Sequence, residues 1–411
     1  MLFATRWHDP VTQHLHDLIE SRTLVVSDLI PVLWLCGPPG IGKSTVGWEI
    51  FTQLTRAGIE VGYVDIDQLG ICYPEPVSDP GRHRMKAQNL GAVVANYRAA
   101  GARCVIVSGV VDPDRGVPAG LIPRAAVTVC RLRTGRDELR QRFLGRGEQA
   151  GLPDGVLSQA DAMDASDVAD VCVDTSGLAP AEAARLVRER IAGWPILTGP
   201  GRPDEAGPHD SPATTADGPV LVLCGATGVG KSTAGFEVYR RTLRAGSAAA
   251  YIDLDQIGFC RPVPAGDIGG HRLKARNLAA IWHTYRAAGA QGLIAVGPVE
   301  SEAAAKAYAG ALPRAAITLC RLDAGAGELT RRIMLRGHGG SWPQPGDPLT
   351  GQPTEYLLRV AASAAAEAEA LEHAVTGALR VDTDGLTVEE TADLIAARTR
   401  WPSRLLTPGC R

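Results

Sequence analysis

A phosphate-binding loop occurs twice in the chain, at residues 37–45 and 225–233. Both copies follow the pattern G-x-x-x-x-G-K-[ST], come after a short apolar run and precede a helix-compatible stretch, which is the context that this pattern requires. Such a turn directs backbone N–H groups and a helix dipole to one point, where a triphosphate chain is the expected occupant. The predicted nucleotide-binding residues are Gly37, Gly40, Gly42, Lys43, Ser44 and Thr45, and Gly225, Gly228, Gly230, Lys231, Ser232 and Thr233.

The repeat extends well beyond the loops. At an offset of 188 residues, the segments 63–70 and 83–86 return as 251–258 and 271–274. The second copy then gains about 18 residues after Gly337, around 338–355. A period this long indicates two duplicated domains instead of a solenoid of short units.

The length of 411 residues also favours two domains. A stretch rich in Pro, Gly, Ser and Thr separates the copies and is typical of a flexible linker. The predicted parts are an N-terminal helical extension at 1–30, a first domain at 31–194, the linker at 195–218, a second domain at 219–402 and a C-terminal tail at 403–411.

Apolar runs alternate with helical patterns in each copy. In the first copy, strands are expected at 31–36, 61–66, 103–108, 125–131 and 170–174, and helices at about 43–57, 84–100, 135–146, 156–168 and 180–192. Nearly continuous apolar strands are typical of a parallel sheet covered by helices on both faces. The predicted fold class is α/β, with two duplicated P-loop NTPase domains, each a parallel five-stranded sheet flanked by helices, and with ligands at the carboxyl ends of the strands.

Composition argues against several other classes of protein, namely nucleic-acid-binding, membrane and secreted ones. The net charge is −3 without a basic block, which disfavours a nucleic-acid partner. No apolar run reaches some 18 residues and the first residues mix charges into the apolar ones, so we expect neither a membrane span nor a signal peptide. The nine cysteines form no C-x-x-C pair and are expected to be reduced core residues, as in a cytoplasmic protein.

An acidic pair ends the second strand of each copy, Asp65 with Asp67 and Asp253 with Asp255. Alternation along a strand would put both carboxylates on one face. Beside the loop, one carboxylate could hold Mg²⁺ together with the loop serine, Ser44 or Ser232, while the other orients and deprotonates an acceptor hydroxyl. A helix cap or a turn is the alternative, and it suits one aspartate better than two.

Only five of the 42 basic residues are lysine, and four of these occupy equivalent positions in the two copies. Lys43 and Lys231 belong to the loops, whereas Lys86 and Lys274 begin a later helix. That cluster is either a solvated helix face or a grip on a polar or anionic substrate. The candidate substrate-binding residues there are Arg84, Lys86, Asn89, Arg272, Lys274 and Asn277.

An acidic residue also recurs after the third strand, as Asp112 and Glu300. It either contacts substrate or caps the following segment. The third strand itself ends in Ser108 or Val296, so neither copy has a carboxylate there to polarise water. This favours transfer over hydrolysis.

Loop, acidic pair and later arginines resemble the P-loop small-molecule and nucleotide kinases, and Asp65-Ile66-Asp67-Gln68 is most similar to the shikimate kinase type. The resemblance implies that Asp65 and Asp253 serve the metal, and Asp67 and Asp255 the acceptor hydroxyl. Because the glycine triplet of shikimate kinases is replaced here by 108–112, shikimate itself is not the expected substrate.

The resemblance also implies lid arginines within 139–147 and 329–337. Their candidates are Arg142 with Arg146 and Arg332 with Arg336. The members of each pair are four residues apart, hence on one helical face, where they could close over the transferred phosphoryl group. A salt-bridged surface helix is the alternative for either member alone.

The sequence therefore predicts a kinase with two ATP sites, each using Mg²⁺. It would transfer the γ-phosphoryl group to a hydroxyl or phosphate of a small metabolite or nucleotide. The alternative is a regulatory or partner-binding ATPase whose domains open and close on ATP. The identity of the acceptor, the activity of each site and pairing of the two domains within the chain are left open.

Overall fold

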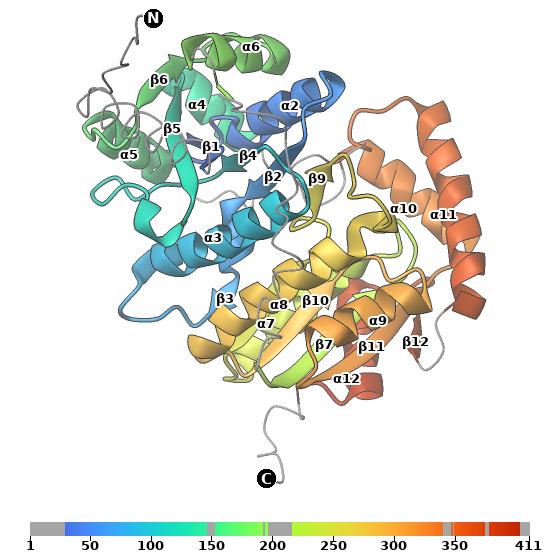
Figure 1. Cartoon of the computed structure of the whole chain (residues 1–411). Helices are drawn as coiled ribbons and strands as arrows, with labels where there is room; N and C mark the ends of the chain where they lie inside the picture. The colour runs from blue at the N-terminus through green and yellow to red at the C-terminus, as the bar shows by residue number, and fades with distance from the viewer. Residues whose placement is uncertain are drawn as a thin grey trace, which may run out of the picture.

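The computed structural model describes residues 29–145, 153–191, 194–195, 216–339, 347, 349–374 and 378–402 (Figure 1). Residues 1–28 of the predicted N-terminal extension, the C-terminal tail and nearly all of the predicted linker lie outside these residues, as does part of the segment after Gly339. The division into domains at the predicted boundaries stays a prediction.

The first half is an α/β layer. Its parallel strands run in the order β6-β5-β1-β4-β2. They are β1 (Ile30–Cys36), β2 (Val61–Asp65), β4 (Cys104–Ser108), β5 (Ala125–Arg133) and β6 (Val171–Asp174). The helices are α2 (Lys43–Arg56), α3 (His83–Ala99), α4 (Arg136–Leu144), α5 (Pro153–Asp164) and α6 (Pro180–Arg190). These elements match the predicted ones to within a few residues, which confirms the α/β prediction.

The second half has the same strand order, β12-β11-β7-β10-β8. Its strands are β7 (Gly218–Cys224), β8 (Ala249–Asp253), β10 (Gly292–Val296), β11 (Ala315–Asp323) and β12 (Leu379–Asp382). Its helices are α7 (Lys231–Arg244), α8 (His271–Ala287), α9 (Glu302–Ala311), α10 (Ala326–Gly337), α11 (Thr354–Ala374) and α12 (Val388–Thr399). Helix α11 has 21 residues where α5 has 12, so part of the length gained by the second copy is helical.

Each sheet carries a sixth strand that the other half supplies. Strand β9 (Phe259–Arg261) pairs antiparallel with β2, and strand β3 (Cys72–Tyr73) pairs antiparallel with β8. In Figure 1, β9 lies beside β2 although the two are far apart in sequence. The prediction of five-stranded, purely parallel sheets is therefore wrong, because segments of two or three residues are too short to show a periodic pattern.

Side chains next to the exchanged strands pack into the opposite half. The ring of Phe259 lies 4.8 Å from that of Trp48 and 6.0 Å from that of Tyr63, edge-on to the first. Reciprocally, Ile71 packs against the core of the second half, and its carbonyl accepts a hydrogen bond of 2.9 Å from the Tyr251 N–H. The exchange covers the open edge of both sheets.

A continuous apolar core joins the two halves. Helices α3 and α8 pack against each other, and the fully buried rings of Tyr97, Trp282 and Tyr285 lie in this shared core. Within it the Asn96 amide donates a hydrogen bond of 2.9 Å to Oδ1 of Asn277. The opposite faces of the sheets have separate cores under α2 and α6 and under α7 and α12. The halves are therefore paired through both backbone and side chains.

The described residues contain neither a membrane-spanning helix nor a disulfide. No helix among them is both long and apolar enough to cross a membrane. Their cysteines form no disulfide, and all except Cys172 are buried, as predicted for core residues.

Replacing Phe259 by alanine should loosen the first half, although the residue belongs to the second. Loss of the ring should cost on the order of 2–3 kcal/mol, below the value for a wholly buried phenylalanine. Hydrogen exchange followed by mass spectrometry should show faster exchange in β2. The control is Ile268→Ala, whose side chain is 92% exposed. Faster exchange in the second half alone would contradict the strand exchange.

Candidate functional site

Both phosphate-binding loops end in a left-handed glycine that begins a helix. Gly42 has φ of 101° and Gly230 has φ of 98°, and α2 and α7 begin at the next residue. Glycine is the residue that adopts this conformation without strain. Nζ of Lys43 lies 3.0 Å from the carbonyl oxygen of Pro38, so the loop lysine folds back over its own loop. Lys231 does the same with two loop carbonyls, at 2.8 and 2.9 Å.

The first aspartate of each acidic pair faces the loop serine. Ser44 Oγ donates to Asp65 Oδ2 at 3.0 Å, and Ser232 Oγ donates to Asp253 Oδ2 at 2.9 Å. Burial, and then the charge of the second aspartate, raise the pKa of both Asp65 and Asp253. A buried carboxylate that burial destabilises gains most from a nearby cation, and a hydroxyl with one carboxylate is a donor set that Mg²⁺ accepts. The residues therefore fit this metal.

The second aspartate does not continue the strand as predicted. Strand β2 ends at Asp65, and Asp67 lies in the 3₁₀ helix η1 (Ile66–Gly70). Oδ1 of Asp65 caps that turn by accepting the Asp67 N–H at 3.0 Å, and Asp253 accepts from the Asp255 N–H in the same way. The pair therefore does not alternate along one strand face. Asp65 combines the cap and the loop contact, which the sequence analysis treated as alternatives.

Ser108 adds a contact that has no equivalent in the second half. Its hydroxyl donates to Asp65 Oδ2 at 3.0 Å and lies 2.9 Å from the Tyr63 hydroxyl. Val296 occupies the matching position and has no hydroxyl. The contact of the Ser108 hydroxyl was not predicted, because the sequence shows this position only as one that lacks a carboxylate.

Each second aspartate forms an ion pair with the lysine of the following helix. Lys86 Nζ lies 2.7 Å from Asp67 Oδ1, and Lys274 Nζ lies 2.7 Å from Asp255 Oδ1. The lysine side chains are only 8% and 10% exposed, whereas the aspartates are half exposed. A solvated helix face is therefore wrong for Lys86 and Lys274. They hold the second aspartate in place while leaving it open to a ligand.

The other predicted substrate-binding residues of this helix do not gather with the lysines. Asn89 and Asn277 are wholly buried and donate to the carbonyls of Leu69 and Ile257 at 2.8 and 2.7 Å. They fix the turn that carries the second aspartate, and a contact with substrate stays a prediction. Arg84 and Arg272 are exposed at the helix start, where Asp79 and Asp267 cap the backbone.

The recurring acidic residue has a different setting in each half. Asp112 Oδ1 accepts the N–H groups of Asp114 and Arg115 at 2.9 and 3.2 Å, which is the capping alternative. Glu300 Oε2 instead lies 2.6 Å from Nε2 of His271. Burial alone would raise the pKa of Glu300, but the hydrogen bond and charge of His271 outweigh it, so the pKa is lowered.

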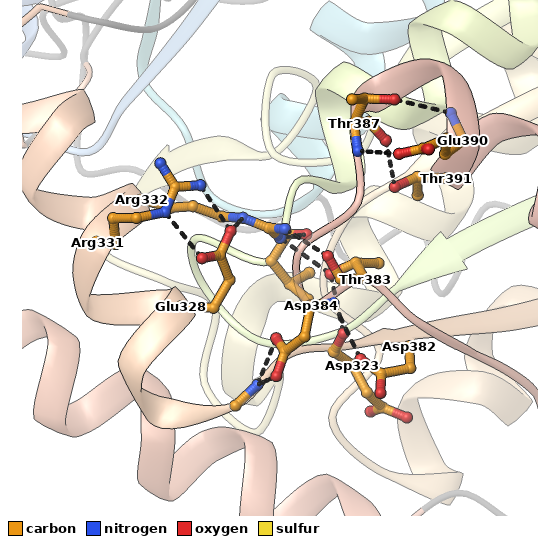
Figure 2. A network of polar contacts seen from close by, with 12 residues as sticks. Asp323, Glu328, Arg331, Arg332, Asp382, Thr383, Asp384, Thr387, Glu390 and Thr391 are labelled. Carbon is orange, nitrogen blue, oxygen red and sulfur yellow. Dashed lines mark hydrogen bonds and ion pairs between the residues drawn. The ribbon is translucent and has the colours of Figure 1, made fainter.

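The predicted lid arginines hold the loop to the sheet. Figure 2 shows Arg332 reaching from α10 to Glu328 and to the turn after β12. Its Nη1 donates to the carbonyl of loop residue Val229 at 2.7 Å and its Nη2 to that of Thr383 at 2.7 Å. Arg142 contacts Ile41 and Thr175 in the same manner, at 3.2 and 3.3 Å.

In the second half, the other member of the predicted arginine pair does not join Arg332. Arg336 Nε lies 2.8 Å from Asp347 Oδ2, away from the contacts of Arg332. Arg146 lies outside the described residues. In the part of the chain that the structure describes, the arginines therefore do not converge as a lid.

A cavity of about 140 Å³ opens beside Asp255 and Lys274 in the second half. Its other walls come from β9 and from the start of α8. The lining residues include Phe259, Cys260, Arg261, Val263, Gly270 and Leu273. None of Arg261, Val263 and Gly270 was singled out by the sequence analysis, because they differ from their counterparts in the first copy.

No protein-family profile matches the chain, and no curated protein is significantly similar to it in sequence. Solved structures do match, among them shikimate kinases, a gluconokinase, an APS kinase and a sugar kinase, all P-loop kinases that cover about 40% of the chain.

Three of these matches show how low the similarity in sequence and structure is. Shikimate kinase from Acinetobacter baumannii, in complex with shikimate, is 20% identical over 40% of this chain and 95% of its own, with a TM-score of 0.29. APS kinase from Mycobacterium tuberculosis, in complex with AMPPNP and APS, is 17% identical over 44% and 98%, with a TM-score of 0.28. The Deinococcus radiodurans tunicamycin resistance protein is 17% identical over 44% and 95%, with a TM-score of 0.29. At this distance the matches carry no argument about substrate or mechanism.

Replacing Arg332 by alanine should destabilise the second half by about 2 kcal/mol, because buried carbonyls on the loop and after β12 lose a charged donor. Urea unfolding monitored by circular dichroism would measure this loss of unfolding free energy. The control is Arg331→Ala on the same helix turn, whose side chain is 62% exposed and bonds only to Glu328. If the two variants unfold alike, Arg332 does not secure the loop.

Proposed function

We propose that this protein is an ATP-dependent phosphotransferase with two ATP sites, each using Mg²⁺. It moves the γ-phosphoryl group to a hydroxyl or phosphate of a small metabolite or nucleotide. One observation carries the proposal, namely the chain of contacts at one sheet edge in each half. A loop serine binds a buried aspartate at 3.0 or 2.9 Å, and the next aspartate is held by a lysine at 2.7 Å.

The loop side of this arrangement suits the phosphates. The N-termini of α2 and α7 and the ammonium groups of Lys43 and Lys231 would stabilise the charge on the phosphoryl oxygens. Ser44 with Asp65, and Ser232 with Asp253, would hold Mg²⁺. When bound, Mg²⁺ would supply neutralisation of charge on the phosphate oxygens.

The second aspartate suits the acceptor. The lysine bridge occupies Oδ1 of Asp255, which leaves Oδ2 for the acceptor hydroxyl. As the hydroxyl oxygen bonds to the γ-phosphorus, its proton passes to this carboxylate and the bond to the ADP oxygen breaks. Asp67 with Lys86 has the same geometry in the first half.

The contrasting function, a regulatory or partner-binding ATPase, makes a different prediction. Protein, ATP and Mg²⁺ would be mixed with fractionated metabolite pools, and ADP release would be followed. A phosphotransferase releases ADP faster in the presence of its acceptor. Release that no fraction stimulates would contradict the phosphotransferase proposal and favour the ATPase.

Replacing either loop lysine should remove about half of the bound ATP. Lys43→Ala and Lys231→Ala each delete one of two equivalent ammonium groups, and calorimetric titration with a non-hydrolysable ATP analogue would count the remaining sites. The double variant should bind none. Complete loss of binding in one single variant would show that only one loop binds ATP.

Asp255→Asn should lower the acceptor-stimulated turnover of the second site by roughly 10²–10⁴-fold, the usual contribution of a positioned base, as measured in a Lys43→Ala background that silences the first site. ATP affinity should change little, because Asp253 and Ser232 keep the metal side intact. The comparison is Glu302→Gln, an exposed acid on α9 that pairs only with Lys306. Equal turnover in both variants would exclude Asp255 as the acceptor base.

A further inference from the structure

The cavity beside Asp255 is lined in part by residues that differ from their counterparts in the first half. Its volume is about 140 Å³, similar to the ~150 Å³ that admits benzene in an engineered protein cavity. In the first half, the residues that match this lining include Tyr73, Glu75 and Arg82, whose side chains contact one another. The difference lies on the acceptor side, not at the loops.

Three side chains account for the closure. At the repeat offset, Tyr73, Glu75 and Arg82 match Arg261, Val263 and Gly270. The guanidinium of Arg82 lies 3.9 Å above the Tyr73 ring and its Nη1 lies 3.5 Å from Glu75 Oε2. The Arg82 side chain is only 11% exposed, so these residues form a packed plug where the second half has its cavity.

The backbone has the same conformation at Arg82 and at Gly270. Arg82 has φ of 58° and Gly270 has φ of 68°, both left-handed. Each precedes the first residue of its helix, α3 or α8. A Cβ placed on Gly270 would meet no atom within 4 Å. The cavity therefore depends on the side chains at these positions and not on a different course of the chain.

Arg261 gives the open cavity its charge. Its guanidinium donates to the carbonyl of its neighbour Cys260 at 3.1 Å. Among the described residues, no carboxylate forms an ion pair with it. Arg261 and the lysine of the Lys274–Asp255 pair thus line a small cavity whose other named walls, Phe259, Val263 and Leu273, are apolar. An anionic group on the ligand would balance this arginine.

We infer that only the second half takes a phosphoryl acceptor, and that the acceptor is a small hydroxyl-bearing compound with a negatively charged group. The first half then binds nucleotide with its acceptor side closed by Arg82. This inference rests on the proposed function, because a phosphoryl acceptor exists only if the protein is a phosphotransferase. The difference in accessibility between the two halves can be tested without catalysis.

Matched cysteines would measure the accessibility of the two positions. Leu273→Cys and Met85→Cys occupy equivalent places on α8 and α3, and both native side chains are 3% exposed. The probes are two methanethiosulfonate reagents of similar size, one carrying a sulfonate and one a trimethylammonium group. Peptide mass spectrometry would separate the new cysteine from the native ones. We expect Leu273→Cys to react at least about tenfold faster than Met85→Cys, and faster with the sulfonate than with the cation.

Exchange of the plug residues between the two halves should reverse the order of the two modification rates. Arg82→Gly should speed modification of Met85→Cys. Grafting the plug into the second half, as Arg261→Tyr with Val263→Glu and Gly270→Arg, should slow modification of Leu273→Cys. Gly270→Arg alone is the smaller change if the graft unfolds. Binding of an ATP analogue shows that each variant is folded. Equal rates at the two cysteines, or rates that no swap alters, would overturn the asymmetry, and faster reaction with the cation would overturn the charge assignment.

Failure of this inference and failure of the proposed function are distinguishable. If the labelling pattern holds but no metabolite fraction stimulates ADP release, the cavity asymmetry stands and phosphoryl transfer is wrong. If a fraction stimulates release and Gly270→Arg leaves that stimulation unchanged, transfer stands and the second half is not the acceptor site. Loss of stimulation in Gly270→Arg with ATP-analogue binding kept supports both.

Discussion

The reciprocal exchange of edge strands is the constraint on which the rest of the molecule depends. β3 and β9 are too short to be stable alone, and each pairs its backbone with the sheet of the other half. Both strands lie between the acidic pair and the helix that carries the buried lysine. The exchange therefore fixes the segment that forms the acceptor side of each site, and neither half has a complete sheet edge without its partner.

The shared core extends this dependence to the charged groups. α3 and α8 bury their apolar faces against each other, so their lysines enter the protein from a fixed direction. Burying a lysine ammonium is costly unless a carboxylate pairs with its charge. Asp67 and Asp255 form these ion pairs at 2.7 Å. The buried asparagines Asn89 and Asn277 fix the turn between strand and helix through its carbonyls. Removing one partner of such a pair costs more than the pair itself contributes.

The sequence predicted what depends on long periods and local motifs. The loops and the order of strands and helices along the chain were accessible from spacing, whereas the choice of Asp65 as the partner of Ser44 came from the resemblance to P-loop kinases. Strands β3 and β9 were not accessible, because their pairing joins residues 176 to 200 positions apart and shows no period. The lid role of Arg332 stays a prediction, and its contact with the loop was not foreseen, since spacing shows which residues share a helical face but not that a loop carbonyl lies opposite. The differences between the copies, at Arg82 and Gly270, carried site information that a search for identities passes over.

The two halves differ where their ligands are free to differ. The phosphate chain of a nucleotide is the same at both loops, so the groups that would face it, Lys43 with Lys231 and Ser44 with Ser232, are the same in both. An acceptor wall has no such restriction, and its side chains differ, as at the left-handed position that holds Arg82 in one half and Gly270 in the other. Because β9 rests on β2, the wall of the open cavity is supported by the half whose own cavity is closed. A first half without an acceptor would therefore still be required to build the site of the second.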